Sequence, residues 1–453
     1  MRNININLLL LLLAINSSVI AQYSILYNFN SADPSYQPTG TLTLSDNVLY
    51  GITVSGVGTT ANNIFKINTD GTGYTNIYDF NDTIGISPLG VNVSGSVIYG
   101  ITEGIIDSAG FIYKININGT GYKELFAFTG KGTIGSLPQS PMLLFNDTLY
   151  GTTGWGGKYN YGTIFKISTS GKGYVDLHDF NFTEGANPYQ NPLSVKGTTL
   201  YGMTYHGGAN SMGCIYKMNT DGTGYTDIHD FTENSPMPVG ALTISDSVLF
   251  GSLWLGGTDR DGSIFRINTN GSGYSTLFSF NGTNGQYCLG TPAMVYNTLY
   301  GMTYQGGVNQ RGIIFSLYTD GFGFTDLLDF NWMSAPIGSG PVGQLLLSDS
   351  VLYGMTSGGG LYNQGVIFKY VPVNTAISES IPDDDVYPNP TTGILNIHVP
   401  DLIKTEVINP EGILAGTYYG TSIDISSLPA GMYIINIYNT GGLLNRVKII
   451  LSK

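Results

Sequence analysis

The chain has 453 residues, of which 42% are apolar and only 11% carry a charge. So few charges argue against a disordered polyelectrolyte, and so many apolar residues are enough for a folded core. The 31 acidic and 18 basic residues give a net charge of −13, which argues against nucleic acid or anionic lipid as a partner. The 63 glycines and 32 tyrosines indicate many turns and aromatic strands.

Residues 1–21 predict a secretory signal peptide. Arg2 precedes the apolar run of residues 8–15, and residues 19–21 supply a small-residue cleavage site. The run is too short to span a bilayer, and no later segment reaches the roughly 18 apolar residues that a transmembrane helix needs. We therefore expect export through the periplasm, no transmembrane segment, and an extracellular or outer-membrane-surface location.

A Leu-Tyr-Gly phrase, with Ile or Phe at some positions, occurs seven times and is followed each time by an Ile-Phe-Lys-like phrase. Its glycines are Gly51, Gly100, Gly151, Gly202, Gly251, Gly301 and Gly354, which lie 49 to 53 residues apart. A period near fifty that is filled with short strand-like runs is typical of a β-propeller. The sequence therefore predicts an all-β fold.

Each repeat predicts four strands, a to d, separated by glycine-rich turns. In the fourth repeat these are residues 192–195, 199–204, 214–219 and 225–231. Helical periodicity is absent. The alternation of apolar and polar residues is weak, as expected for sheets that pack on both faces.

Strand d occurs only six times after an Ile-Phe-Lys-like phrase, although there are seven such phrases. Six copies follow their repeats, at residues 74–80, 122–128, 174–180, 225–231, 274–280 and 324–330, but none follows the last Ile-Phe-Lys phrase. A seventh copy, residues 23–30, comes directly after the predicted signal peptide. We therefore expect a seven-bladed β-propeller over residues 22–371, closed by its N-terminal strand so that no sheet edge is left open.

Two repeated features favour structural roles. Lysine and aspartate lie ten residues apart in Lys166–Asp176 and Lys217–Asp227, and we expect them to face each other across the c–d hairpin. A lysine ring for an anionic ligand is the alternative, but a solvated charge pair is favoured. The Asp-Gly-Thr-Gly turns at Asp70 and Asp221 lack the alternating oxygens and closing glutamate of a calcium loop, which predicts hairpin turns.

No catalytic residue, metal site or cofactor is predicted. His178 and His229 occupy the same strand-d position in adjacent repeats, which marks them as repeat residues. No Gly-x-Ser-x-Gly elbow, His-Glu-x-x-His motif or Cys–His arrangement is present. Cys214 and Cys288 leave two alternatives open, a disulfide or two free thiols.

The d–a and b–c loops, which share one face, are long and vary between repeats, whereas the a–b and c–d turns are short and similar. The b–c loops carry the candidate ligand-binding residues, which are Trp155, Tyr159, Tyr205, Trp254, Arg260, Tyr304 and Arg311. Stacked aromatic rings with polar neighbours suit a sugar or an extended peptide. The alternative, which is favoured, is that each aromatic ring before a Gly-Gly pair fills the gap between adjacent blades.

The repeat ends near residue 371, residues 372–385 predict a linker, and residues 386–453 predict a small β-sandwich. The tail opens with Tyr-Pro-Asn-Pro at residues 387–390, continues with Leu-Pro-Ala-Gly-Met-Tyr at 428–433 and ends in a lysine-containing strand. It resembles the type A C-terminal sorting domain of the type IX secretion system of Bacteroidetes. That resemblance implies the type IX translocon and sorting machinery as partners, with release or attachment at the cell surface.

The repeats resemble the tandem-repeat family called GloVer over roughly residues 40–370, through Leu-Tyr-Gly-Met-Thr, Gly-Gly and Ile-Phe-Lys. Val57 and Ile105 interrupt the Gly-Gly position in the first two repeats. No defined activity comes with this resemblance. We expect a secreted or cell-surface propeller that binds glycan or protein. The alternatives are an extracellular polysaccharide hydrolase or lyase that uses loop carboxylates such as Asp259 and Asp261, and a structural surface protein.

Overall fold

The computed structural model describes residues 22–30, 37–54, 62–80, 87–104, 110–129, 134–332, 337–372, 386–399, 401–409, 414–439 and 442–452. These residues form strands and connecting loops and contain no helix. The predicted signal peptide and all of the predicted linker except Pro372 lie outside them, as do Val57 and Ile105. The chain divides into two compact units, one over Tyr23–Val371 and one that contains Pro372–Lys453.

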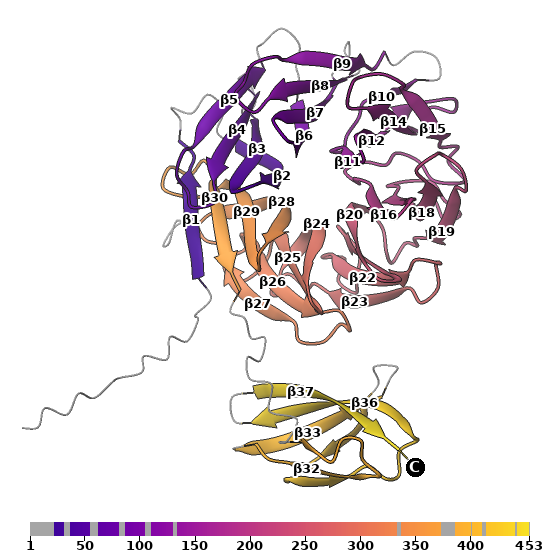
Figure 1. The fold of residues 1–453 in the computed structure, drawn as a ribbon, viewed down its shortest axis with the longest axis vertical. Helices are drawn as coiled ribbons and strands as arrows, with labels where there is room; N and C mark the ends of the chain where they lie inside the picture. Colours follow the sequence, from indigo (N-terminus) through magenta and orange to yellow (C-terminus); the bar gives the residue numbers. More distant parts are fainter. Residues whose placement is uncertain are drawn as a thin grey trace, which may run out of the picture. The chain divides into compact units, whose positions relative to one another are not determined.

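The first unit contains seven four-stranded antiparallel sheets that surround a central opening (Figure 1). We number the sheets in chain order and keep the letters a to d for the strands of each. Sheets 1 to 3 are β2 (Gln37–Ser45), β3 (Val48–Val54), β4 (Asn62–Asn68) and β5 (Thr75–Phe80); β6 (Ser87–Ser94), β7 (Val97–Glu103), β8 (Phe111–Asn116) and β9 (Lys123–Ala127); and β11 (Leu143–Phe145), β12 (Thr148–Thr153), β14 (Thr163–Ser168) and β15 (Val175–Asp179). A two-stranded pair, β10 (Gly135–Ser136) and β13 (Trp155–Gly156), accompanies sheet 3.

Sheets 4 to 6 repeat this order. They are β16 (Ser194–Lys196), β17 (Thr199–Met203), β18 (Cys214–Asn219) and β19 (Thr226–Asp230); β20 (Pro238–Ser245), β21 (Val248–Leu253), β22 (Ser263–Asn268) and β23 (Ser275–Ser279); and β24 (Gln286–Val295), β25 (Thr298–Gln305), β26 (Ile313–Tyr318) and β27 (Thr325–Asp329). Sheet 7 consists of β28 (Ser339–Ser348), β29 (Val351–Gly358), β30 (Val366–Val371) and β1 (Gln22–Asn28).

The two halves of the repeated phrase pack on each other. In sheet 3 the glycine of Leu-Tyr-Gly, Gly151, pairs across the strands with Phe165 of the Ile-Phe-Lys phrase. A Cβ atom on Gly151 would lie 2.4 Å from the Phe165 ring. The ring therefore covers the glycine, and a larger residue there would displace it. The same pair recurs in the other six sheets, as Gly51–Phe65, Gly100–Tyr113, Gly202–Tyr216, Gly251–Phe265, Gly301–Phe315 and Gly354–Phe368.

Stacked rings join strand d of one sheet to strand d of the next. His178 lies 3.7 Å from Tyr225 between ring centroids and nearly parallel to it, and His229 lies 4.0 Å from Tyr274. The matching pairs elsewhere are Tyr27–Tyr74, Tyr78–Tyr122, Phe126–Tyr174 and Phe278–Phe324. Both histidines are thus part of the packing between sheets, as their repeated position indicates.

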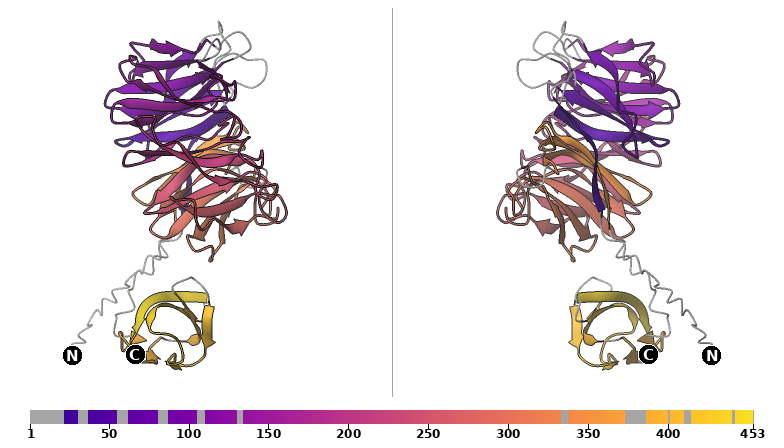
Figure 2. Two further views of the ribbon diagram at one scale, coloured as in Figure 1. Left: turned by 90° about the vertical axis from the view of Figure 1, so that its right-hand side faces the viewer. Right: turned by 90° about the vertical axis from the view of Figure 1, so that its left-hand side faces the viewer.

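β1 occupies in sheet 7 the place that strand d holds in the other six sheets. Figure 2 shows it, in indigo, alongside the orange strands of that sheet. The backbone N–H of Phe29 donates to the carbonyl of Gly365 at 3.1 Å, and Asn28 Oδ1 accepts from the Leu361 N–H at 2.8 Å. Phe29 is fully buried in a core that sheets 7 and 1 share. Residues more than 330 positions apart are therefore packed together.

The predicted lysine–aspartate pairing is wrong by one residue. Lys166 faces Val175, and Asp176 faces Phe165. The c–d turn closes with a hydrogen bond from the Ser168 N–H to the Lys172 carbonyl, and the pairing of strands c and d shifts register between Ile164 and Phe165.

The lysine Nζ atoms instead bond to the neighbouring sheet. Lys166 and Lys217 donate to the carbonyls of Thr220 and Thr269, each at 3.2 Å. The hairpin-turn interpretation of the Asp-Gly-Thr-Gly segments agrees with their hydrogen bonds, since Asp221 Oδ1 accepts from the Thr223 N–H at 2.9 Å. These bonds lower the pKa of Asp221.

The second unit contains two sheets around one core. One sheet orders β31 (Val386–Tyr387), β32 (Ile394–Ile397) and β35 (Ser422–Asp424), and the other orders β34 (Leu414–Tyr418), β33 (Leu402–Ile408), β36 (Gly431–Asn439) and β37 (Gly442–Leu451). Their shared core includes Leu395 and Ile423 from the first sheet and Val407, Ile435 and Ile449 from the second.

Candidate functional site

The b–c loops of sheets 3 to 7 share one backbone conformation. Each starts with a Gly-Gly pair and ends with a glycine of positive φ, and the third residue after the pair is left-handed. These left-handed residues are Asn160, Ser211, Arg260, Gln310 and Asn363, with φ between 56° and 62°. Five loops with different sequences therefore follow nearly the same path, with a difference at Gly256, which lacks the positive φ of the first glycine in the other four pairs. The side chains of these loops vary between repeats as expected, while their backbones are alike.

Strand d holds four of these loops in place, those of sheets 3, 4, 6 and 7. The N–H after the Gly-Gly pair donates to a strand-d carboxylate 21 residues later, from Lys158 to Asp179 at 2.7 Å and from Val308 to Asp329 at 2.6 Å. Ala209 does the same to Asp230 at 2.5 Å. In sheet 7 the acceptor is the amide oxygen of Asn28 on β1. The loop base is thus fixed by the scaffold.

Three exposed residues follow each Gly-Gly pair, and we call these five triplets the loop tips. They are residues 158–160, 209–211, 258–260, 308–310 and 361–363. Their side chains are Lys-Tyr-Asn, Ala-Asn-Ser, Thr-Asp-Arg, Val-Asn-Gln and Leu-Tyr-Asn in that order. One rigid frame therefore displays five different sets of side chains on the same face.

Two of the predicted aromatic residues lie together. Trp254 is stacked on Tyr287 of the next sheet at 5.0 Å, and it lies 6.4 Å from Tyr304 between ring centroids. A Cβ atom on Gly340 of sheet 7 would lie 3.2 Å from the Tyr304 ring. These half-buried rings fill gaps between neighbouring sheets, as the favoured alternative holds, and keep part of their surface exposed.

The other predicted residues are spread over the face. Trp155 and Tyr159 are 44% and 46% exposed. Tyr205 packs edge-on against Tyr189 at 5.8 Å. Arg260 is an exposed loop-tip residue, and the guanidinium of Arg311 lies 4.6 Å above the ring of Trp332.

Sequence reasoning missed several aromatic partners. These are Tyr189, Tyr287 and Trp332, which precede or begin strand a rather than follow the Leu-Tyr-Gly phrase. Their position in the d–a loops, which that reasoning assigned to this face, was the only available signal.

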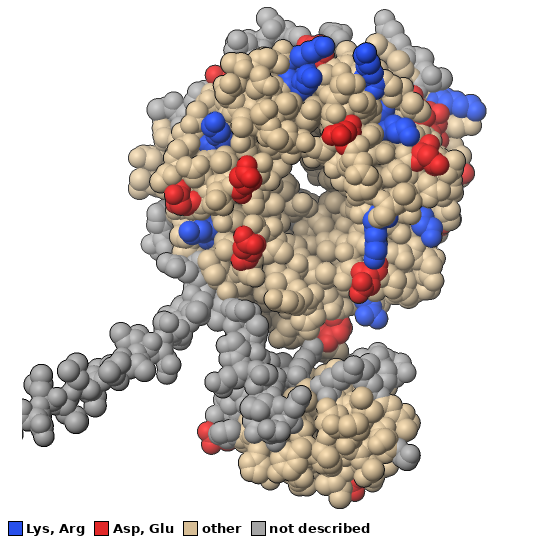
Figure 3. Space-filling model, viewed as in Figure 1, with Lys and Arg blue, Asp and Glu red and all other residues tan. Residues whose placement is uncertain are grey.

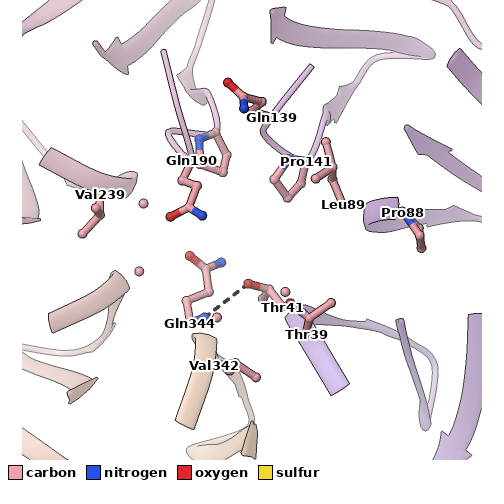
Figure 4. A pocket seen from close by; sticks show the side chains of 15 residues that line it. Thr39, Thr41, Pro88, Leu89, Gln139, Pro141, Gln190, Val239, Val342 and Gln344 are labelled. Carbon is pink, nitrogen blue, oxygen red and sulfur yellow. Dashed lines mark hydrogen bonds between the residues drawn. The ribbon is translucent and has the colours of Figure 1, made fainter. Parts of the chain in front are cut away.

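A cavity of about 290 Å³ lies on the axis of the ring, and all seven sheets contribute residues to it. Figure 3 shows the face hollowed at this place, with positive and negative charges scattered around it. Strand a and the segment before it supply the lining, including Gln139, Gln190 and Gln344 (Figure 4). No feature of the sequence had marked this cavity.

The acidic groups of this region are mostly structural. Asp230, which accepts the hydrogen bond from the Ala209 N–H, lies beside Asp227. The pKa of Asp227 is raised to about 6 by burial and by the neighbouring carboxylate. The same causes raise the pKa of Asp326 beside Asp329 to about 6. Of the two loop carboxylates considered for catalysis, Asp261 accepts from Gln286 Nε2 at 2.5 Å and Asp259 is exposed.

Cys214 and Cys288 are buried free thiols. Burial raises the pKa of Cys288 to about 12. Within the described part of the chain, no three or more His, Cys, Asp and Glu side chains group in a way that could hold a metal ion. Nor does any helix there have the length and apolar character needed to cross a membrane.

The fold and the tail define an exported, all-β repeat protein. Residues 91–297 match the model described as the Gloeobacter/Verrucomicrobia repeat, and residues 385–452 match the secretion system C-terminal sorting domain, so both predicted resemblances are confirmed. The type IX sorting domain indicates export to the cell surface or extracellular space and contact with the secretion machinery. A comparison with curated proteins finds no match.

Solved structures show similar folds. PorZ, a surface component of the type IX secretion system of Porphyromonas gingivalis, matches at 14% identity and a TM-score of 0.48, over 95% of this chain and 61% of PorZ. A Niastella koreensis GH74 enzyme matches at 14% identity and a TM-score of 0.51, over 94% of this chain and 67% of the enzyme. A Vibrio parahaemolyticus oligogalacturonate lyase matches at 10% identity and 0.46, over 78% and 97%. The chain thus spans about three fifths of the length of PorZ, and these likenesses concern the fold alone.

Proposed function

We propose that the seven sheets are the blades of a seven-bladed β-propeller over residues 22–371, which the N-terminal strand closes. The position of β1 in sheet 7 and its contacts with sheet 1 support this proposal. The other proposed parts are a signal peptide over residues 1–21, a linker over 372–385, and a C-terminal β-sandwich over 386–453. The signal peptide directs the chain to the periplasm, and the sandwich then presents it to the type IX translocon.

The exported propeller binds a glycan or a surface protein on the face that carries the loop tips. The observation that supports this function is the shared backbone of five loops that present five different sets of side chains. A rigid scaffold with variable tips lowers the entropic cost of binding and leaves specificity to the side chains. Tyrosine, asparagine and serine at the tips are residue types that suit adaptable recognition.

The proposed ligand contacts are Trp155, Tyr159, Arg260 and Arg311 on the exposed surface, with Tyr205, Trp254 and Tyr304 nearer the cavity. To test them, the purified full chain is screened against a glycan array and against surface proteins. The loop-tip variant Tyr159→Ala, Tyr362→Ala should lose about tenfold or more in affinity, because two exposed rings leave the contact.

The opposite ends of the sheets provide a matched control. Tyr296 and Phe322 lie in a–b and c–d turns and are 82% and 56% exposed. The variant Tyr296→Ala, Phe322→Ala also removes two exposed aromatic rings, both more exposed than Tyr159 or Tyr362, and should bind like the wild type. Equal losses in both variants, or no ligand in either screen, would contradict the proposal. Turnover of a polysaccharide that Asp259→Asn or Asp261→Asn abolishes would support the hydrolase or lyase alternative.

A further inference from the structure

The cavity on the ring axis has a polar but uncharged lining. None of the fifteen described residues that line it carries a charge. The side chains that reach into it are amides and hydroxyls, such as those of Gln190, Gln344 and Thr41, and its walls are prolines, valines and a leucine. A charged ligand would lose its hydration there without gaining a counter-charge, which disfavours ions. A neutral ligand rich in hydroxyl groups would find both donors and acceptors.

The amides of the cavity are orientated by their neighbours. Gln139 Nε2 donates to Glu103 Oε1 at 3.0 Å, and Gln190 Nε2 donates to the hydroxyl of Tyr189 at 3.2 Å. Figure 4 shows the side-chain amides of Gln190 and Gln344 directed toward one another across the cavity. Gln190 and Gln344 thus form a hydrogen-bonding site to which sheets on opposite sides of the ring each contribute one side-chain amide.

Glycines of strand a make the wall around these arms rigid. Gly343 has φ 67°, and a Cβ atom on it would lie 2.0 Å from the carbonyl oxygen of Gly40 in sheet 1. Gly240 packs in the same way against the backbone of sheet 6, since a Cβ atom on it would lie 2.6 Å from the nitrogen of Thr291. Backbone thus meets backbone between successive sheets, so the cavity is formed before any ligand arrives, which reduces the cost of binding.

Aromatic rings lie close to the lining, in the segment before strand a, in strand a itself and in strand b. Tyr189 directly precedes Gln190, and Tyr287 lies three residues before Gly290 of the lining. Tyr304 packs over Gly340, two residues before Val342 of the lining. Aromatic faces beside amide side chains suit the apolar and hydroxylated surfaces of a sugar ring.

We infer that the axial cavity accommodates one unit of a neutral oligosaccharide, held by Gln190 and Gln344, while the rest of the glycan crosses the aromatic rim. This rests on the proposed binding function and specifies its ligand class. The loop tips then contact the more distant sugar units. An acidic polysaccharide is excluded from the cavity by the uncharged lining.

The full chain is titrated with neutral and uronic-acid oligosaccharides of equal length. We expect the neutral series to bind, and Gln190→Ala, Gln344→Ala to weaken that binding about tenfold or more, because two hydrogen-bonding groups are lost. Asn297→Ala, which removes an exposed amide in the a–b turn of sheet 6 at the opposite ends of the sheets, serves as the control and should change the affinity less than threefold. Thermal unfolding of each variant confirms that the ring remains folded.

Three results would overturn the inference and leave the proposed function standing. They are neutral-glycan binding that the paired glutamine variant leaves unchanged, binding of the acidic series alone, and binding of a surface protein that no oligosaccharide displaces. If no glycan and no protein binds the loop face, the proposed function itself fails.

Discussion

The clearest test of the ring closure is the substitution Phe29→Ala. Phe29 follows β1, is fully buried, and packs edge-on against Phe65 of sheet 1 at 5.8 Å. It also lies 5.2 Å from Tyr27 and 5.9 Å from Tyr74 between ring centroids. Tyr27 belongs to the same N-terminal strand, but the contacts with Phe65 and Tyr74 require that strand to lie against sheet 1.

Truncation of such a buried phenylalanine to alanine costs about 3–5 kcal/mol, because apolar burial is lost and a cavity remains. For a folded unit of about 350 residues we expect the melting temperature to fall by roughly 4–7 °C, because the entropy of unfolding is about 2.1 cal/mol/K per residue. Phe280 is the matched control, since it is fully buried and has rings at 5.1, 5.2 and 6.2 Å. Phe280→Ala should therefore cost the same within about 1 kcal/mol.

Scanning calorimetry of both variants in the full chain supplies the comparison. One outcome is that Phe280→Ala lowers the melting temperature as expected, whereas Phe29→Ala leaves it at the wild-type value. β1 would then not pack against sheet 1. That result would refute the proposed closure. Similar losses in both variants would support it.

Three further predictions concern stability. The pKa values of Asp227 and Asp326 are raised to about 6 in the folded state, so folding favours their protonated forms. The resulting contribution to the free energy of unfolding is complete below pH 3.8 and is lost as the pH rises through 6. Each half-exposed pair contributes about 1 kcal/mol, and relative to the wild type an Asp227→Asn, Asp326→Asn variant should lose this pH dependence in thermal scans. Burial lowers the pKa of His178, so His178→Phe, which keeps the stacked ring, should gain stability over the wild type as the pH falls below 6.5, again by thermal scans. Gly151→Ala should destabilise the ring by about 2 kcal/mol or more, because its Cβ meets the Phe165 ring, whereas Gly197→Asp, in an open turn where other repeats carry aspartate, should change little in urea titrations.

Local patterns predicted the architecture well because the repeat states each element several times. The Leu-Tyr-Gly and Ile-Phe-Lys phrases marked strands b and c, and the structure adds their reason, which is the ring of Phe165 over Gly151 and its six counterparts. The missing seventh copy of strand d directed attention to residues 23–30. Comparison of copies within one chain thus substitutes for an alignment.

Features that depend on three-dimensional register were not predictable in this way. The lysine–aspartate pairing was wrong because the c–d ladder has an irregularity between Ile164 and Phe165, which local sequence does not reveal. The shared loop backbone was not predictable because its left-handed position is occupied by different residue types, such as Asn160, Arg260 and Gln310. The axial cavity was hidden because its glutamines come from sheets far apart in sequence.

Hydrogen exchange tests the central claim, ligand binding at the loop face, most directly. The full chain is compared with and without a saturating concentration of the tightest-binding oligosaccharide from the neutral panel. We predict slower exchange in residues 158–160, 209–211, 258–260 and 308–310 and in the strand-a segments around Gln190 and Gln344, with the c–d turns unchanged. Protection confined to the c–d turns or to the C-terminal unit would contradict the account.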